Sequence, residues 1–101
     1  MILRLWKGWA ELGRPDDYPR HFREIVLPEL RAVAGFVDAE LLKRTEDDRI
    51  LFTVVTRWES MDAVKAFAGD DPETAVVHDA AAAVLIGFDD RVEHHELIEK
   101  S

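Results

Sequence analysis

Three stretches of the chain alternate apolar and polar residues with the period of a β-strand. They span residues 2–9, 36–45 and 50–58, and the third is rich in Val, Thr, Phe and Ile. The polar residues 46–49 separate the second stretch from the third and predict a tight hairpin turn. The pattern therefore predicts three strands, of which the last two are neighbours in a hairpin.

A helical pattern fills the chain between the first two strands. Pro15 suits the first turn of a helix, and Asp16 and Asp17 are favourable near the positive end of its dipole. One apolar face follows at helical spacing and consists of Tyr18, Phe22, Ile25, Val26 and Leu30. Pro28 falls inside this pattern, and it predicts a kink or an early end because it lacks an N–H and clashes with the preceding turn.

Two more helices and a strand are predicted after residue 58. Ser60 is a good N-cap residue, and Gly69 ends the short helix that it begins. The Asp-Pro pair at residues 71–72 predicts the N-cap and first residue of a further helix, which Gly87 ends. Residues 88–98 predict the last strand.

The resulting order is β-α-β-β-α-β, with the second helix in two pieces. This is the α+β, ferredoxin-like order, in which helices cover one face of a four-stranded antiparallel sheet. Both sides of the third strand are apolar, with Phe52, Val54 and Trp58 on one side and Leu51 and Val55 on the other. Because such a sheet needs cover on both faces, we expect a homodimer that forms through the open sheet face.

Composition narrows the choice of partners. The formal net charge is -8 and the pI is about 4.9, which argues against nucleic acid and anionic membrane surfaces as partners. The chain has no Cys, so disulfides, thiol catalysis and thiolate metal sites are excluded. No apolar run approaches the roughly 20 residues that span a bilayer, and no signal-peptide pattern is present. We expect a cytoplasmic protein that forms one domain over residues 1–101.

Several motifs of the chain resemble the antibiotic biosynthesis monooxygenase-like family. The main one is VVTRWES at residues 54–60, followed by AFAG at 66–69. Shorter matches, which extend the resemblance over nearly the whole chain, lie at residues 3–8, 27–28, 35–36 and 92–96. The resemblance implies a dimeric α/β barrel, with a pocket between the helices and the sheet of each subunit.

The resemblance also implies a chemically mixed superfamily. Some members oxygenate polycyclic aromatic substrates without a metal or organic cofactor, because the enolate or phenolate of the substrate itself reacts with oxygen. Others isomerise or decarboxylate, and a further branch degrades haem with an Asn on the first strand, a Trp after the third strand and a downstream His ligand. This chain has no Asn, Phe67 stands where that Trp would be, and His78 is out of register. We therefore expect neither haem degradation nor a metal or organic cofactor.

Five aromatic residues are candidates for binding a planar substrate. Aromatic side chains stack on planar ligands, and the candidates are Trp6, Trp58, Phe67, Tyr18 and Phe22. The alternative for Trp6 and Trp58 is packing in the core or the dimer interface, and Tyr18 and Phe22 fit the inner face of the first helix. Trp9 has the opposite parity to Trp6, so the two cannot face one pocket from a regular strand.

His78 and His94 are the candidate catalytic residues. A histidine that faces a pocket can act as a base, because its unperturbed pKa is about 6.5; a surface or capping role is the alternative for His78. His94 and His95 are adjacent on a strand and face opposite sides, so a shared metal site is not expected. We expect the flanking glutamates to raise the pKa values of both, and we expect His21 to be a solvated helix residue.

Two arginines alternate with the aromatic positions. If Arg4 lies on the same side as Trp6, it can bind an anionic substrate oxygen; a structural role is the alternative. Arg57 is expected to face the open side of the sheet. There it needs a carboxylate partner such as Glu40 or Glu96, because an unpaired buried charge is costly.

Two functions are compatible with these features. The first is a cofactor-independent monooxygenase, an oxidoreductase that acts on a small aromatic or polyketide-like molecule. The second is a dimeric domain that binds a small hydrophobic or aromatic molecule, or serves as a stress-linked accessory, without catalysis. The second function is considered because the sequence shows no clear set of catalytic residues.

Overall fold

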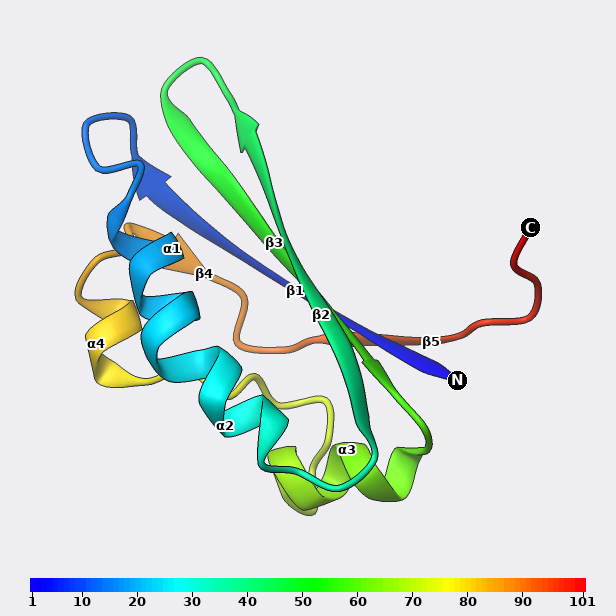
Figure 1. The fold of residues 1–101 in the computed structure, drawn as a ribbon. Coiled ribbons are helices and arrows are strands. Elements are labelled where there is room, and N and C mark those ends of the chain that lie inside the picture. The colour runs from blue at the N-terminus through cyan, green and yellow to red at the C-terminus, as the bar shows by residue number, and fades with distance from the viewer.

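The computed structural model describes all 101 residues. One antiparallel sheet carries its helices on one side, and the opposite side of the sheet has no helix over it (Figure 1). The α+β, ferredoxin-like arrangement expected from the sequence is confirmed. No helix is long and apolar enough to cross a membrane.

Strand β1 (Ile2–Glu11) lies in the centre of the sheet. It pairs along its whole length with β3 (Arg49–Trp58), which pairs on its other side with β2 (Phe36–Thr45). Its remaining edge pairs with two short strands, β4 (Gly87–Phe88) and β5 (Glu93–Glu96). The sheet order is therefore β2-β3-β1, followed by a last strand in two pieces.

This division corrects the continuous last strand predicted over residues 88–98. After Phe88 the N–H of Asp89 still bonds the carbonyl of Lys7 of β1 at 2.9 Å. The N–H of Val92 instead bonds the carbonyl of Glu73 at 2.8 Å. The strand is interrupted because the connection after α3 competes for its backbone groups.

The first helical layer continues past the proline that was expected to disturb it. It consists of α1 (Asp17–His21), a π-helical turn η1 (Phe22–Val26) and α2 (Leu27–Arg31). Pro28 lies in the first turn of α2, where the missing N–H is tolerated. The predicted early end of the helix at Pro28 is therefore wrong. The helix is instead irregular in the π-helical turn just before the proline.

The short helix after β3 follows the prediction closely. Helix α3 (Met61–Ala68) begins with Ser60, whose hydroxyl accepts the N–H of Ala63 at 3.2 Å. Gly69 ends it with a positive φ of 91° and donates its N–H to Lys65. Gly35, before β2, has a φ of 89°, and a Cβ there would lie 2.5 Å from the Cβ of Ala63, so only glycine allows this close approach.

The long helix predicted from residues 71–72 is wrong. The structure has only the four-residue helix α4 (Asp79–Ala82), and His78 is its N-cap residue. The backbone of the preceding segment bonds to other elements, since the N–H of Ala75 bonds Asp90 at 2.8 Å and Thr74 forms an isolated bridge with Arg91. These long-range bonds replace the helical ones that local propensity favours.

The two sides of the sheet follow the predicted alternation. The side chains of β3 that face the helices are all buried, and they are Ile50, Phe52, Val54, Thr56 and Trp58. Trp58 has no exposed surface and anchors a core cluster with Leu30, Ala63 and Val64. A second cluster forms around Tyr18 and Phe22 of the first helical layer. The cavity described below lies between these packed regions.

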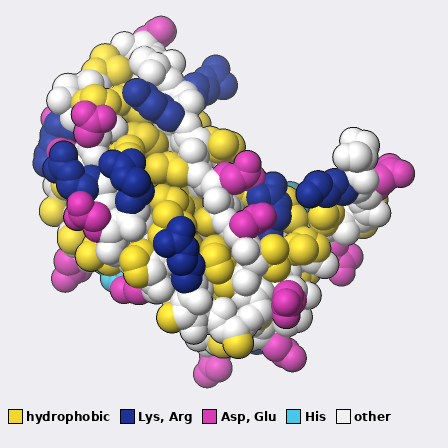
Figure 2. Space-filling view, in the orientation of Figure 1, with side chains coloured by type: hydrophobic (Ala, Val, Ile, Leu, Met, Phe, Trp, Pro, Cys, Tyr) yellow, Lys and Arg dark blue, Asp and Glu magenta, His cyan; other side chains and the backbone are white.

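Charged side chains are scattered over the surface. On the face in view, Lys and Arg side chains alternate with acidic and hydrophobic ones and form no continuous basic area (Figure 2). On the open side of the sheet, Arg57 pairs with Asp38 at 2.9 Å and also with Glu40, as the sequence predicted for Glu40. These hydrogen bonds raise the pKa of Arg57.

Candidate functional site

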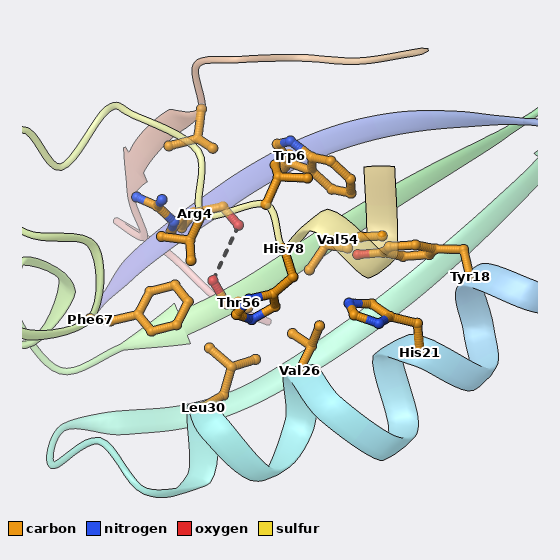
Figure 3. Close-up of a pocket in the computed structure, with 14 residues that line it drawn as sticks. Arg4, Trp6, Tyr18, His21, Val26, Leu30, Val54, Thr56, Phe67 and His78 are labelled. Carbon is orange, nitrogen blue, oxygen red and sulfur yellow. Dashed lines mark hydrogen bonds between the residues drawn. The ribbon is translucent and has the colours of Figure 1, made fainter. Parts of the chain in front are cut away.

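A cavity of about 50 Å³ lies between the helix side of the sheet and the first helical layer. The segment that leads into α4 closes it from a third side (Figure 3). Most of its lining is apolar, with side chains from β1, β3, α3 and the segment before α4. The polar lining residues are Arg4, His21, Thr56 and His78. As it stands, the space suits one or two water molecules, which take about 30 Å³ each.

One wall of the cavity is aromatic. The rings of Trp6 and Tyr18 lie 5.7 Å apart, and the indole N–H of Trp6 donates to the carbonyl of Asp89 at 2.8 Å. Gly8 gives the indole its room, because a Cβ at that position would lie 2.8 Å from the Trp6 ring. Two of the five predicted substrate-binding residues therefore meet here, and both have fixed orientations.

Tyr18 brings a hydroxyl into this wall. Its ring packs on Phe52 at 5.6 Å and on Phe22 at 6.5 Å. Burial raises its pKa, so the phenol stays protonated over the physiological range. Because none of the hydrogen bonds within the protein uses the Tyr18 hydroxyl, it is free to bind a ligand.

The other predicted aromatic residues divide between the cavity and the core. Phe67 of α3 lines the cavity. Trp58 lies behind it with ring centroids 5.5 Å apart, and the Trp58 indole N–H donates to Thr56 Oγ1 at 2.8 Å. Phe22 packs behind Tyr18. Trp58 and Phe22 are thus supports of the wall, because neither lines the cavity.

His78 faces the cavity and has a carboxylate partner. As the N-cap residue of α4, it lies outside the helix that was predicted to carry it. Its Nε2 lies 2.8 Å from Oε2 of Glu29, which projects from α2. A carboxylate that holds one imidazole nitrogen orients the ring. The sequence shows no link between Glu29 and His78, which are 49 residues apart.

His21 corrects the expectation of a solvated helix residue. It is 9% exposed, lines the cavity, and its ring lies edge-on to that of His78 at 5.9 Å. Burial, and secondly the nearby His78, lower its pKa, so His21 is neutral at pH 7. Its buried Nε2 has no hydrogen-bond partner in the protein. A buried polar atom without a partner at a cavity wall is a binding position for a ligand or a water.

Arg4 lies on the same side of β1 as Trp6 and forms the opposite end of the cavity from Tyr18 and His21 (Figure 3). Its guanidinium donates to the carbonyl of Pro72, to the carbonyl of Thr74 at 3.0 Å and to Nε2 of His94 at 3.0 Å. These bonds hold the segment before α4 against the sheet, so Arg4 shapes the cavity that it lines.

His94 lies behind Arg4 and outside the cavity lining. It faces the helix side in register with Arg4, whereas His95 faces the open side and lies 3.2 Å from Glu93, so their opposite orientation is as predicted. Burial, and secondly the Arg4 charge, lower the pKa of His94, which contradicts the expected rise. Since its Nε2 accepts from Arg4, His94 has a structural partner in place of a free basic nitrogen.

The chain contains no group of three or more His, Cys, Asp or Glu side chains arranged to hold a metal ion. The residues that the structure adds to the predicted site are Glu29 and His21. Both lie on the first helical layer, and both become part of the site only because the distant segment before α4 packs over them.

The fold is shared with solved structures of known activity. The haem-degrading protein MhuD of Mycobacterium tuberculosis, with two haems in its active site, superposes with a TM-score of 0.67 at 18% identity over 100% of this chain and 99% of its own. SnoaB of Streptomyces nogalater, a cofactor-independent oxygenase determined as the mutant N63A, gives 0.65 at 14% identity, covering 98% and 95%. The monooxygenase from the gene ActVA-Orf6 of Streptomyces coelicolor, in complex with nanaomycin D, gives 0.60 at 17% identity, covering 99% and 92%.

At these identities the likenesses show the fold alone. No curated protein matches the chain. The model of the family described as antibiotic biosynthesis monooxygenase, however, matches residues 4–79. This match spans three of the five strands and the helices that form the cavity walls. The chain therefore belongs to the antibiotic biosynthesis monooxygenase family.

Proposed function

We propose that the protein is a cofactor-independent monooxygenase that acts on a small aromatic or polyketide-like substrate. The observation that carries this proposal is that His78, which lines a cavity with an aromatic wall, is held by the Glu29 carboxylate. Trp6, Tyr18 and Phe67 hold the planar substrate, and His78 removes a proton from it. The descriptions of SnoaB and of the ActVA-Orf6 product as oxygenases of this fold support the same reaction class.

The His78–Glu29 pair suits general-base catalysis. With the proton on Nε2 donated to Glu29, Nδ1 of His78 is the free basic nitrogen. The Glu29 carboxylate stabilises the imidazolium that forms, as carboxylates do in other His–carboxylate pairs. A positioned base of this kind contributes about 10²–10⁴-fold to the rate of proton transfer.

The oxygen step needs no group beyond substrate and O₂. Removal of a proton from an activated CH₂ group, as in an anthrone, leaves an anion whose electrons form a C–O bond with O₂. The resulting peroxide takes the proton from His78, loses its remaining C–H proton and releases water as the O–O bond breaks. One oxygen atom becomes the new carbonyl, the other becomes water, and the four electrons come from the CH₂ carbon.

Haem degradation is not proposed, although MhuD shares the fold. The chain has no Asn for the first strand, and Phe67 replaces the Trp that the haem-degrading branch uses.

We further propose that two copies pair through the open side of the sheet. The apolar side chains Leu5, Leu51 and Val55 line this side, and Leu42 is 49% exposed there. Such an unpartnered apolar face suits a symmetric interface. A cytoplasmic location is likewise a proposal that rests on composition.

A second candidate function is binding without catalysis. The observation that favours it is the cavity itself, since side chains already fill most of the space between the layers and leave about 50 Å³. Under this alternative, aromatic ligands raise the midpoint of thermal unfolding and no turnover follows.

Oxygen uptake tests the proposal. Metal-free protein is incubated with anthrones, and dissolved oxygen is followed with an electrode. We expect uptake above the uncatalysed rate and a loss of about 10²-fold or more of the enzymatic part in His78→Ala. His95→Ala is the matched control, because this histidine faces the open side of the sheet. No uptake across a broad substrate panel would reject the oxygenase and leave the binding function.

A further inference from the structure

Arg4 is a buried cation in the wall of an apolar cavity. Only 5% of its surface is exposed, and the centre of its guanidinium lies 5.8 Å from the centroid of the Phe67 ring. Every arginine–carboxylate pair of the protein uses another arginine, so no carboxylate oxygen lies within 4.0 Å of the Arg4 nitrogens. The charge of Arg4 has no counter-ion in the chain.

The polar groups nearest to Arg4 do not neutralise its positive charge. The imidazole of His94 is neutral, because burial and the guanidinium lower its pKa, and it serves only as an acceptor. The Glu73 carboxylate is engaged by Arg91 at 2.8 Å. Burial lowers the pKa of Arg4 to about 10, which still keeps it protonated at neutral pH. A buried cation without a counter-ion is costly, and an anionic ligand would offset that cost.

Arg4 also has free donors. Of the five N–H groups of a guanidinium, those on Nη1 bind Pro72 and His94, and one on Nη2 binds Thr74. The Nε–H and the second Nη2–H have no acceptor in the protein. These two adjacent nitrogens carry the kind of donor pair that binds both oxygens of a carboxylate.

We propose that Arg4 is the anion-binding residue of this cavity, and that its ligands are planar aromatic molecules that carry a carboxylate. This inference rests on the proposed function, because it assigns the substrate class of the same cavity. With the carboxylate at Arg4, the ring system extends along Trp6 toward His21 and His78 at the other end (Figure 3). Because the cavity measures about 50 Å³, binding requires the lining side chains to move apart. Arg4 thus fixes which end of the substrate meets the base.

A pair of isosteric probes tests the assignment. Binding of 2-naphthoate and of its neutral carboxamide is measured by isothermal titration calorimetry at pH 7. We expect the carboxylate to bind about tenfold more tightly or better. Arg4→Gln removes this preference, which is read as the ratio of the two affinities in the same variant, so that any change of the cavity caused by loss of the Pro72 and Thr74 bonds affects both probes alike. Arg57→Gln is the control, because Arg57 lies on the opposite side of the sheet, and it retains the preference.

Equal affinities of the two probes, no binding of either, or a preference that persists in Arg4→Gln would overturn the assignment. If Arg4→Gln does not fold, the ¹⁵N–¹H resonance of Arg4 Nε in the unmodified protein decides. It shifts with 2-naphthoate and stays in place with the carboxamide, and an unchanged resonance counts against the proposal. Because neither readout involves oxygen, a retained carboxylate preference without oxygen uptake rejects only the oxygenase.

Discussion

The two sides of the sheet carry apolar side chains of the same kinds and differ in what covers them. On the helix side, Phe52 and Trp58 have no exposed surface. On the open side, Leu42 is half exposed, and the strands are crossed by the ion pairs of Arg57 with Asp38 and Glu40. The open side thus combines exposed apolar side chains with ion pairs that hold its charged side chains in place. Such a surface suits an interface with a second copy.

Part of the cover on the helix side is an irregular segment, although the side chains beneath it are buried. The first helical layer and α3 pack tightly, but the segment before α4 is held by Arg4 and by β-type bonds to residues near β5. This irregular cover leaves the cavity and brings His78 to Glu29. In the proposed function, one side of the sheet carries the chemistry and the other side carries the assembly.

The largest expected difference between the sides is in stability. Phe52→Ala removes a fully buried ring and is expected to lower the free energy of unfolding by about 3–5 kcal/mol. Leu42→Ala on the open side is expected to cost less than about 1 kcal/mol. Urea unfolding at concentrations where the protein is monomeric measures both. A similar loss for the two variants would mean that the sides are equally well covered.

The next largest expected difference between the two sides is in dimer formation. Leu51→Lys places a charge on β3, on the open side of the sheet and next to Arg44 of β2, and in the proposed symmetric dimer it brings like charges together. We expect the dissociation constant to rise by about 100-fold, as measured by sedimentation, with the circular dichroism spectrum unchanged. Lys65→Glu on the outer surface of α3 should leave assembly as it is. An unmodified protein that is monomeric at micromolar concentration would refute the interface.

The smallest effect is a pH dependence that belongs to the helix side. Burial lowers the pKa of His21 in the folded protein, so folding favours its neutral form. This contribution is complete above about pH 6.5, the pKa of the unfolded chain, and is lost as the pH falls through the lower folded pKa. His21→Gln should reduce the loss of stability between pH 7 and 5 relative to the unmodified protein. Equal slopes in denaturant titrations would contradict the buried state of His21.

Much of the fold can be predicted from the sequence, because its elements are specified locally. The alternation in residues 50–58 sets which side chains face the helices, and Ser60 and Gly69 supply their own capping bonds to α3. Aromatic positions on β1 and α1 likewise follow from periodicity. These features need no information from distant parts of the chain.

The rest of the site depends on contacts that the sequence does not reveal. Residues 71–78 have the signals of a helix start, yet Arg4 binds the carbonyls of Pro72 and Thr74, and the segment forms a turn and an isolated bridge in place of a helix. For this reason His78 is displaced from the predicted helix and meets Glu29. The same segment buries His21. From the sequence alone, His21 is predicted to be a surface residue.

Proton removal at the cavity is the most direct test of the account. Exchange of the CH₂ protons of an anthrone into D₂O is followed by NMR under anaerobic conditions, so that oxygen chemistry does not contribute. We predict that the protein accelerates exchange, that His78→Ala abolishes the acceleration, and that Glu29→Gln reduces it by about tenfold while Glu24→Gln on the same helical layer has no effect. Exchange at the uncatalysed rate, or an acceleration that survives in His78→Ala, would contradict it.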